Sequence, residues 1–313
     1  MNFKKPFFWD LKKPNFFSYL LIPFTIPVII NNFFLNIKKK NKFSKIKTIC
    51  VGNIYLGGTG KTPLTIKLFN IIKKMNLEVV TAKKFYSNQI DEQTLLRTKT
   101  NTIVSKKRED AINQAINNSN QVIIFDDGLQ EKKINYDLKI VCFKKKKWIG
   151  NGQLIPSGPL REKIENLKNY DAVFLNGKDD SSNKIRETIH KLNPKIEIFD
   201  TNYEIGNFDE LNKNSTYLIF SGIGDPLSFK EILLDNNIDV IKEIIFPDHH
   251  IYKKKDIKNI FEEANRLGAK ILTTEKDFIK LSDHDAEKIN FLKIELKIAE
   301  EERLINFLND KLC

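Results

Sequence analysis

Apolar residues fall into short continuous runs and into runs with helical spacing, and this alternation predicts an α/β protein. Lys45–Val51 reads as a strand that becomes buried towards its end. Gln121–Phe125 and Tyr217–Phe220 read as later buried strands. After the first strand, the apolar side of a predicted helix is formed by Leu64, Ile66, Leu68, Ile71 and Ile72. The pattern predicts two α/β units and a short appendage.

The apolar segment Phe16–Leu35 is unlike the rest of the chain, because its twenty residues carry no charge and lysines flank both ends. That length suits a helix that crosses a bilayer. Pro23 and Pro27 interrupt it, and Asn31 and Asn32 weaken its far end. We therefore expect a kinked helix in the membrane interface; a true span and a helix packed on the protein's own core are the alternatives. No signal-peptide cleavage site follows the segment.

Composition narrows the choice of partner. The chain has 313 residues, with 52 Lys and Arg against 40 Asp and Glu, so its formal net charge is +12. Such a charge favours an anionic partner: phosphate groups, an acidic membrane surface or nucleic acid. We expect no nucleic-acid partner, since the sequence contains no recognition helix, finger or ribonucleoprotein pattern. Cys50, Cys142 and Cys313 show no metal-binding spacing and are expected to be reduced structural thiols.

A glycine-rich turn follows the first strand and precedes the first helix of the core. Its residues are Gly57, Gly58, Thr59, Gly60, Lys61 and Thr62. In such a turn backbone N–H groups surround phosphate oxygens, the lysine reaches the β- and γ-phosphates, and the threonine hydroxyl ligates Mg²⁺. Tyr55 replaces the first glycine of the usual P-loop pattern. The strand, loop and helix nevertheless stand in the required order, so we expect a site for a nucleoside triphosphate with Mg²⁺ here.

Asp126 and Asp127 stand at the end of the apolar strand Gln121–Phe125 and are followed by Gly128. An acidic pair at this place is typical of the element that lies beside the Mg²⁺ of a P-loop. An Asp-Gly turn with no metal is the alternative.

The order of the motifs resembles the tetraacyldisaccharide 4′-kinase family, the lipid A 4′-kinases, along nearly the whole chain. The matching segments are the proline-broken N-terminal run, Val51–Ile54, Gly57–Pro63, Asp91–Glu92, Asp126–Gln130, Gly150–Glu162, Gly222–Pro226, Phe246–His250 and Thr274–Asp277. The resemblance implies a P-loop NTPase-like fold at the cytoplasmic face of the bacterial inner membrane. It also implies transfer of the ATP γ-phosphate to the 4′-hydroxyl of an acylated glucosamine disaccharide 1-phosphate. We infer no obligate protein partner.

The resemblance assigns roles to several further residues. Asp91 and His249 resemble the family's paired acid–base residues, and an imidazole suits proton transfer near neutral pH. Glu92 and Asp127, with Thr62, resemble residues around Mg²⁺. Phosphate oxygens and substrate are expected near Asp126, Arg161 and Arg108, because a guanidinium fork suits phosphate. For Arg108 a solvated basic turn accounts equally well for the sequence.

These motifs lead us to expect three consecutive parts. Residues 1–40 form the membrane-associating segment, residues 41–205 the P-loop core with a mainly parallel sheet, and residues 206–313 a smaller C-terminal α/β domain that completes the active cleft.

The chain departs from the family in two places. Ala82–Ser87 stands where the family has Ser-Arg-Gly-Tyr-Gly-Gly, and Glu131 replaces a histidine. Lys83 or Lys84 can replace the missing arginine electrostatically, although neither has its fork. We expect activity to survive these changes and acyl preference to change.

Two other functions remain open at this stage. A membrane-associated partitioning-type P-loop ATPase shares Gly57–Thr62, but Leu56 stands where that class has its signature lysine. The second of these functions is that of a soluble small-molecule kinase, which would not explain the apolar N-terminal segment.

Overall fold

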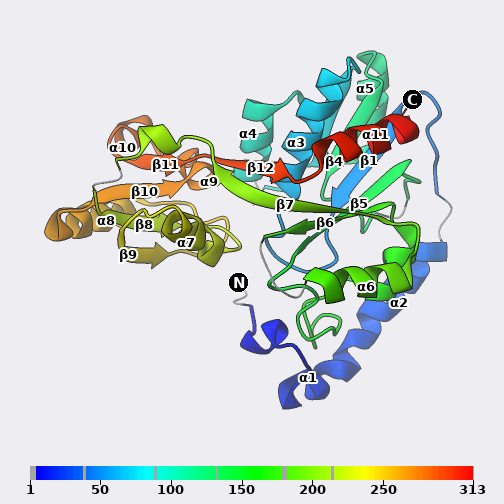
Figure 1. Cartoon of the computed structure of the whole chain (residues 1–313), viewed down its shortest axis with the longest axis horizontal. Coiled ribbons are helices and arrows are strands. Elements are labelled where there is room, and N and C mark those ends of the chain that lie inside the picture. Colours follow the sequence, from blue (N-terminus) through cyan, green and yellow to red (C-terminus); the bar gives the residue numbers. More distant parts are fainter. Residues whose placement is uncertain are drawn as a thin grey trace. The chain divides into compact units, whose positions relative to one another are not determined.

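A computed structural model describes residues 5–37, 40–87, 90–131, 133–177, 182–212 and 215–312. The chain forms two compact units, and their elements can be followed by label in Figure 1. Unit 1 contains Tyr86–Thr98 and Tyr203–Lys297, and unit 2 contains Phe3–Phe85, Lys99–Asn202 and Ile298–Cys313. The passage into unit 1 at Tyr203 lies close to the boundary predicted at residue 206. The prediction of three consecutive parts differs from these units in two places. Tyr86–Thr98 belongs to unit 1, and the chain returns to unit 2 at Ile298.

The larger sheet contains eight strands among the described residues, in the order β12-β7-β6-β5-β1-β4-β2-β3, and its strands β1 to β6 lie in unit 2. The strands from β7 to β3 pair in parallel. Their bounds are β1 Lys47–Gly52, β2 Val79–Lys84, β3 Thr102–Ser105, β4 Val122–Asp126, β5 Leu138–Lys144, β6 Ala172–Asn176, β7 Glu197–Ile205 and β12 Ile294–Ile298. Both faces of the central strands are covered, which explains why they appear in the sequence as unbroken apolar runs. The predicted α/β fold with a mainly parallel sheet is confirmed.

Helices cover the sheet of unit 2. They are η3 Ile164–Asn169, α3 Lys61–Lys74, α5 Arg108–Asn117, α6 Ser182–Leu192 and α11 Glu301–Leu312. Helix α3 packs against β1, β2 and β4 through the predicted apolar side, of which Leu64 and Leu68 are fully buried. Helices α5 and α6 share a core cluster with Cys50 and Phe125.

Unit 1 has a smaller parallel sheet in the order β11-β10-β8-β9. Its strands are β8 Tyr217–Ser221, β9 Val240–Ile245, β10 Lys270–Thr274 and β11 Asn290–Leu292. Its helices are α4 Ile90–Lys99, η4 Phe208–Glu210, α7 Pro226–Asp235, α8 Lys254–Leu267, α9 Glu275–Phe278 and α10 Asp283–Ala286. Leu233 of α7 joins Ile219 in one core cluster, and Ile260 of α8 joins Phe220 in another. Successive residues of β8 point to opposite faces, so α7 and α8 cover the two sides of this sheet.

The N-terminal segment consists of η1 Phe7–Asp10, α1 Phe16–Leu21, η2 Ile22–Thr25 and α2 Ile26–Ile37. The α-helical path changes to a 3₁₀ turn around Pro23, where a proline removes a backbone donor. Phe16–Leu35 is long and apolar enough to cross a membrane, and only 11% of its apolar window is buried. Packing on the protein's own core therefore does not account for this segment.

Polar contacts at both ends attach the segment to the rest of unit 2. Asn151 Nδ2 donates to the carbonyl of Phe8 at 3.1 Å and to Ser18 Oγ at 2.9 Å. Asn32 Nδ2 donates to the carbonyl of Arg161 at 3.0 Å. The asparagine that interrupts the apolar run thus fixes α2 to the loop that carries Arg161.

Gly52, at the end of β1, has no room for a side chain. A Cβ there would lie 2.5 Å from Cγ of the buried Leu129. We predict that Gly52→Ala lowers the free energy of unfolding by about 1–3 kcal/mol through overpacking. At Gly206 a Cβ would meet only the exposed side chain of Glu295. Gly206→Ala is the control, and we expect it to change the free energy of unfolding by less than about 0.5 kcal/mol. Urea unfolding measures both, and equal effects would contradict the prediction.

Candidate active site

The glycine-rich turn of unit 2 is held by its own side chains. Gly57 and Gly60 have φ of 131° and 91°, the left-handed conformations that favour glycine. Asn53 Nδ2 donates to the carbonyls of Tyr55 and Gly57 at 2.6 and 3.0 Å. Helix α3 then begins at Lys61, so backbone N–H groups at its N-terminus face the turn. We did not predict the part played by Asn53, although it lies in a family segment.

Asp126 is the central acidic residue of unit 2. It ends β4, and the register places it beside Val51 of β1 and Lys83 of β2. Its Oδ2 accepts a hydrogen bond from Thr62 Oγ1 at 2.9 Å and forms an ion pair with Lys83 Nζ at 2.6 Å. Asp126 is 1% exposed and Lys83 is 3% exposed. The P-loop threonine is therefore hydrogen-bonded to Asp126, whereas the family resemblance groups it with Asp127.

Asp127 turns in another direction, because it has a φ of 63° in the left-handed region. Its carboxylate lies 3.5 Å from Lys61 Nζ and 3.2 Å from Arg161 Nη1. Arg161 also donates to Gln130 Oε1 at 3.0 Å. Asp127 thus joins the P-loop lysine to Arg161, and the lysine remains partly exposed above the turn.

Arg108, at the start of α5, is 9% exposed, so the alternative of a solvated basic turn is wrong. Its Nη2 donates to the carbonyl of Asp127, and its Nη1 lies 3.4 Å from a carboxylate oxygen of Glu131. The residue that replaces the family's histidine therefore pairs with an arginine that fixes the acidic turn. A direct contact of Arg108 with phosphate stays a prediction.

Two of the cysteines lie near the acidic turn. Cys50 and Cys142 are buried free thiols. Burial raises the pKa of Cys50 to about 12, so this thiol stays protonated at neutral pH. Cys313 lies outside the described residues.

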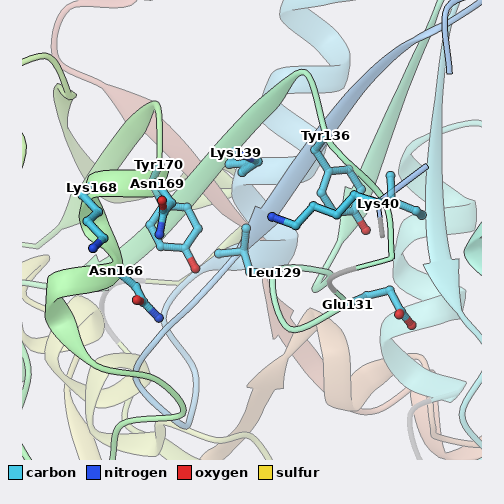
Figure 2. Close-up of a pocket in the computed structure, with 10 residues that line it drawn as sticks. Lys40, Leu129, Glu131, Tyr136, Lys139, Asn166, Lys168, Asn169 and Tyr170 are labelled. Atoms are coloured by element: carbon cyan, nitrogen blue, oxygen red, sulfur yellow. The ribbon is translucent and has the colours of Figure 1, made fainter. Parts of the chain in front are cut away.

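A cavity of about 330 Å³ lies beside the loop that follows the acidic turn. Figure 2 shows that the side chains of Lys40 and Tyr170 extend towards its middle. Lys139, Lys168 and Glu131 also line it. Three lysines against one carboxylate leave an excess of positive charge, in agreement with the basic composition of the chain.

Asp91 and His249, which are 158 residues apart in the sequence, meet within unit 1. His249 Nδ1 lies 2.9 and 3.0 Å from the two oxygens of Asp91. His249 has a φ of 61° and donates its backbone N–H to the carbonyl of Gly222 at 3.1 Å. Burial alone would raise the pKa of Asp91, but the hydrogen bond from His249 and the charge of Lys276 lower it below its usual value. Asp91 is therefore ionised at neutral pH.

The predicted site residues are divided between the two units. Unit 1 contains Asp91, His249 and Glu92, and Glu92 Oε1 accepts a hydrogen bond from Lys276 Nζ at 3.2 Å. Unit 2 contains the glycine-rich turn, Asp126, Asp127, Arg108 and Arg161. Among the described residues, no group of three or more His, Cys, Asp or Glu side chains forms a metal cluster. The metal roles of Glu92 and Asp127 stay predictions.

The buried Asp126–Lys83 pair yields a stability prediction. Asp126→Asn leaves the ammonium of Lys83 without its partner carboxylate, so we expect it to lower the free energy of unfolding by about 3–5 kcal/mol. Asp126→Asn combined with Lys83→Met removes both charges, so it should recover much of that loss. Urea unfolding of the wild type, both single variants and the double variant measures the coupling. Losses of unfolding free energy that simply add in the double variant would contradict the predicted coupling.

Comparison with known proteins identifies the family. The family model described as tetraacyldisaccharide-1-P 4′-kinase matches residues 20–313. The chain is 49% identical over 310 residues to a tetraacyldisaccharide 4′-kinase of Pelagibacter ubique, covering 98% of each chain, and 31% identical to one of Rickettsia bellii, covering 94% of each. The crystal structure of LpxK from Aquifex aeolicus in complex with ATP is 25% identical, with a TM-score of 0.71, and the match covers 95% of this chain and 99% of that one. The chain belongs to the tetraacyldisaccharide 4′-kinase family.

Proposed function

We propose that this protein transfers the γ-phosphoryl group of ATP to the 4′-hydroxyl of a tetraacylated disaccharide 1-phosphate, a precursor of lipid A. The observation that carries the proposal is the presence of a P-loop site in unit 2 and of an Asp91–His249 pair in unit 1. A nucleotide switch needs the first and has no use for the second. Family membership likewise favours the kinase over the partitioning-type ATPase.

Unit 2 binds the nucleotide. Backbone N–H groups of the turn Gly57–Gly60 and the N-terminus of α3 surround the phosphates, because both present unpaired donors to an anion. Lys61 Nζ lies 3.5 Å from Asp127 Oδ2. This carboxylate holds the lysine in place while the ammonium contacts the β- and γ-phosphates. The related Aquifex structure, which was solved with ATP, supports this assignment.

The residues beside Thr62 fit a magnesium ion. Asp126 Oδ1 is buried and makes no hydrogen bond, although Oδ2 of the same carboxylate has two partners. A buried carboxylate oxygen without a hydrogen bond is costly unless a cation faces it. Mg²⁺ keeps several waters and phosphate oxygens and needs only one or two protein ligands, so Thr62 and Asp126 suffice. A bound Mg²⁺ would neutralise negative charge on the phosphate oxygens during transfer.

A side chain of unit 1 accepts the proton of the acceptor hydroxyl. Because Asp91 is ionised, His249 donates its Nδ1–H to this carboxylate, and Nε2 then carries the lone pair. We propose that Nε2 accepts the proton of the 4′-hydroxyl as the hydroxyl oxygen bonds to the γ-phosphorus of ATP. The bond between that phosphorus and the oxygen that bridges to the β-phosphate breaks, and ADP leaves. The carboxylate of Asp91 orients the ring and stabilises the imidazolium that forms.

The apolar N-terminal segment places the enzyme at its lipid. Phe24, Phe33 and Phe34 are 64%, 62% and 60% exposed, which is costly in water and favourable in the apolar layer of a membrane. The flanking lysines would bind anionic headgroups at the cytoplasmic face of the inner membrane, where ATP is present.

The enzymatic proposal predicts that labelled γ-phosphate appears in a detergent-solubilised lipid A disaccharide 1-phosphate. Lys61→Ala should abolish transfer, since the charge on the γ-phosphate loses its partner. Asp91→Ala should lower kcat by about 10²–10⁴. Lys258→Ala is the control, because Lys258 is exposed and pairs only with Glu262 on α8 in the described structure. Hydrolysis of ATP by the wild type without labelled lipid would favour the nucleotide switch.

The membrane proposal predicts that replacing Phe24, Phe33 and Phe34 together by serine reduces co-sedimentation with vesicles of anionic phospholipid. We expect a loss of tenfold or more, about 1.4 kcal/mol in binding. Replacing Leu227 and Leu234, which are exposed on unit 1, by serine is the control. Vesicle binding that is unchanged in the phenylalanine variant and lost in the control would place the membrane contact on unit 1.

A further inference from the structure

Residues 150–161 form a loop, here called the connecting loop, that is bonded to the chain entering the glycine-rich turn. The backbone N–H of Arg161 donates to the carbonyl of Ile54 at 2.8 Å. The backbone N–H of Leu56 donates to the carbonyl of Pro159 at 2.9 Å. The position of the connecting loop and the position of the chain that leads into the turn therefore depend on each other.

The N-terminal segment holds the connecting loop from another side. Trp9 Nε1 donates to the carbonyl of Pro156 at 3.0 Å, and Trp9 is buried. Ser157 Oγ donates to the carbonyl of Ser18 at 2.6 Å, and both serines are fully buried. Buried polar groups that are paired in this way are costly to separate. The connecting loop is thus fixed both to the apolar segment and to the chain that enters the nucleotide site.

Asn32 makes the corresponding contact from helix α2. Val28, Asn32 and Leu35 are partly buried, whereas Phe33 and Phe34 are exposed. Spacings of four and three residues place the partly buried residues on one side of the helix. An amide without a partner is costly in apolar surroundings. On the side of α2 that faces the protein this amide has a partner, and the apolar side chains keep the exposed side.

The backbone of Arg161 is consequently held at both of its polar groups. Its N–H donates to Ile54, and its carbonyl accepts from Asn32 Nδ2 at 3.0 Å. The side chain extends from this fixed point, and its Nη1 lies 3.2 Å from Asp127 Oδ1 and 3.0 Å from Gln130 Oε1. It is 23% exposed, so the guanidinium remains accessible to a phosphate oxygen.

We propose that Asn32 is a positioning residue for phosphoryl transfer: its amide fixes the carbonyl of Arg161 and so holds the guanidinium where it contacts the phosphoryl group in transfer. The inference rests on the kinase function proposed above and adds to it a residue that acts through Arg161. Helix α2 then has two separate tasks. Its exposed phenylalanines contact the membrane, and one amide on its other side supports the site.

The first test compares Asn32→Leu with Asn31→Leu in lipid phosphorylation. Asn31 is exposed, and its side chain makes no hydrogen bond in the part of the chain that the structure describes. Both variants add the same apolar side chain to α2, but only Asn32→Leu loses the bond to Arg161. We expect kcat to be about three- to tenfold lower in Asn32→Leu than in Asn31→Leu. The KM for ATP should be equal, because the glycine-rich turn binds the nucleotide before transfer.

Two measurements on the same samples exclude other causes of a lower kcat. Co-sedimentation with vesicles of anionic phospholipid and the number of ATP molecules bound per protein should agree between the two variants. Asn32→Gln keeps an amide donor and should have a higher kcat than Asn32→Leu. Equal kcat in the two leucine variants, or a loss in Asn32→Leu that is fully accounted for by fewer ATP sites, would overturn the proposal.

A second test asks whether Asn32 acts through Arg161. Arg161→Met removes the guanidinium, so the position of its backbone no longer affects the transferring phosphate. Asn32→Leu combined with Arg161→Met should therefore be no slower than Asn31→Leu combined with Arg161→Met. A further loss of threefold or more in the Asn32 double variant would show that Asn32 acts by another route, and the positioning role would be wrong.

A third measurement is independent of catalysis. In the full-length protein, amide hydrogen exchange is followed by mass spectrometry in a peptide that covers residues 153–162. We expect faster exchange in Asn32→Leu than in Asn31→Leu, because the loop opens more often once the carbonyl of Arg161 has lost its donor. Equal exchange would overturn the inference. Failure of the wild type to phosphorylate lipid would refute the proposed function instead, and the exchange rates would still decide whether Asn32 fixes the connecting loop.

Discussion

The carboxylate of Asp126 is the constraint on which the arrangement of unit 2 depends. A carboxylate that is 1% exposed needs compensation, and here one oxygen receives it from Lys83 and Thr62. That compensation requires β1, β4 and β2 to be neighbours in parallel, because only then do the P-loop, the acidic turn and Lys83 meet at one edge of the sheet. The other oxygen stays buried without a hydrogen bond, in the position that suits a divalent cation.

Unit 1 also contains a buried aspartate whose charge is compensated by neighbouring side chains. Asp91 is 5% exposed, and it is compensated by His249 and by Lys276. In unit 2 the ammonium of Lys83 pairs with Asp126, which is suited to bind a cation. In unit 1 the ammonium of Lys276 lies 3.5 Å from Asp91, which contacts an imidazole. A kinase needs both conditions, since the nucleotide requires cationic charge and the acceptor hydroxyl requires a proton acceptor.

The sequence was sufficient to predict the α/β fold, the glycine-rich turn and the acidic strand end, since these depend on local pattern. It did not indicate that Thr62 bonds Asp126 while Asp127 turns to Lys61 and Arg161, because that depends on strand register and on a left-handed φ at Asp127. Lys83 was predicted only as a replacement charge, and its ion pair with Asp126 follows from the pairing of β2 with β4. Neighbours brought together by tertiary packing leave little local signal.

Analysis of the reaction product shows whether this chain phosphorylates a sugar hydroxyl of a lipid. The enzyme is incubated with Mg²⁺, ATP and the tetraacylated disaccharide 1-phosphate, and the recovered lipid is examined by ¹H–³¹P correlation NMR. We predict a second phosphomonoester whose phosphorus correlates with the proton on C4′. Recovery of unmodified lipid together with ADP and inorganic phosphate would contradict it.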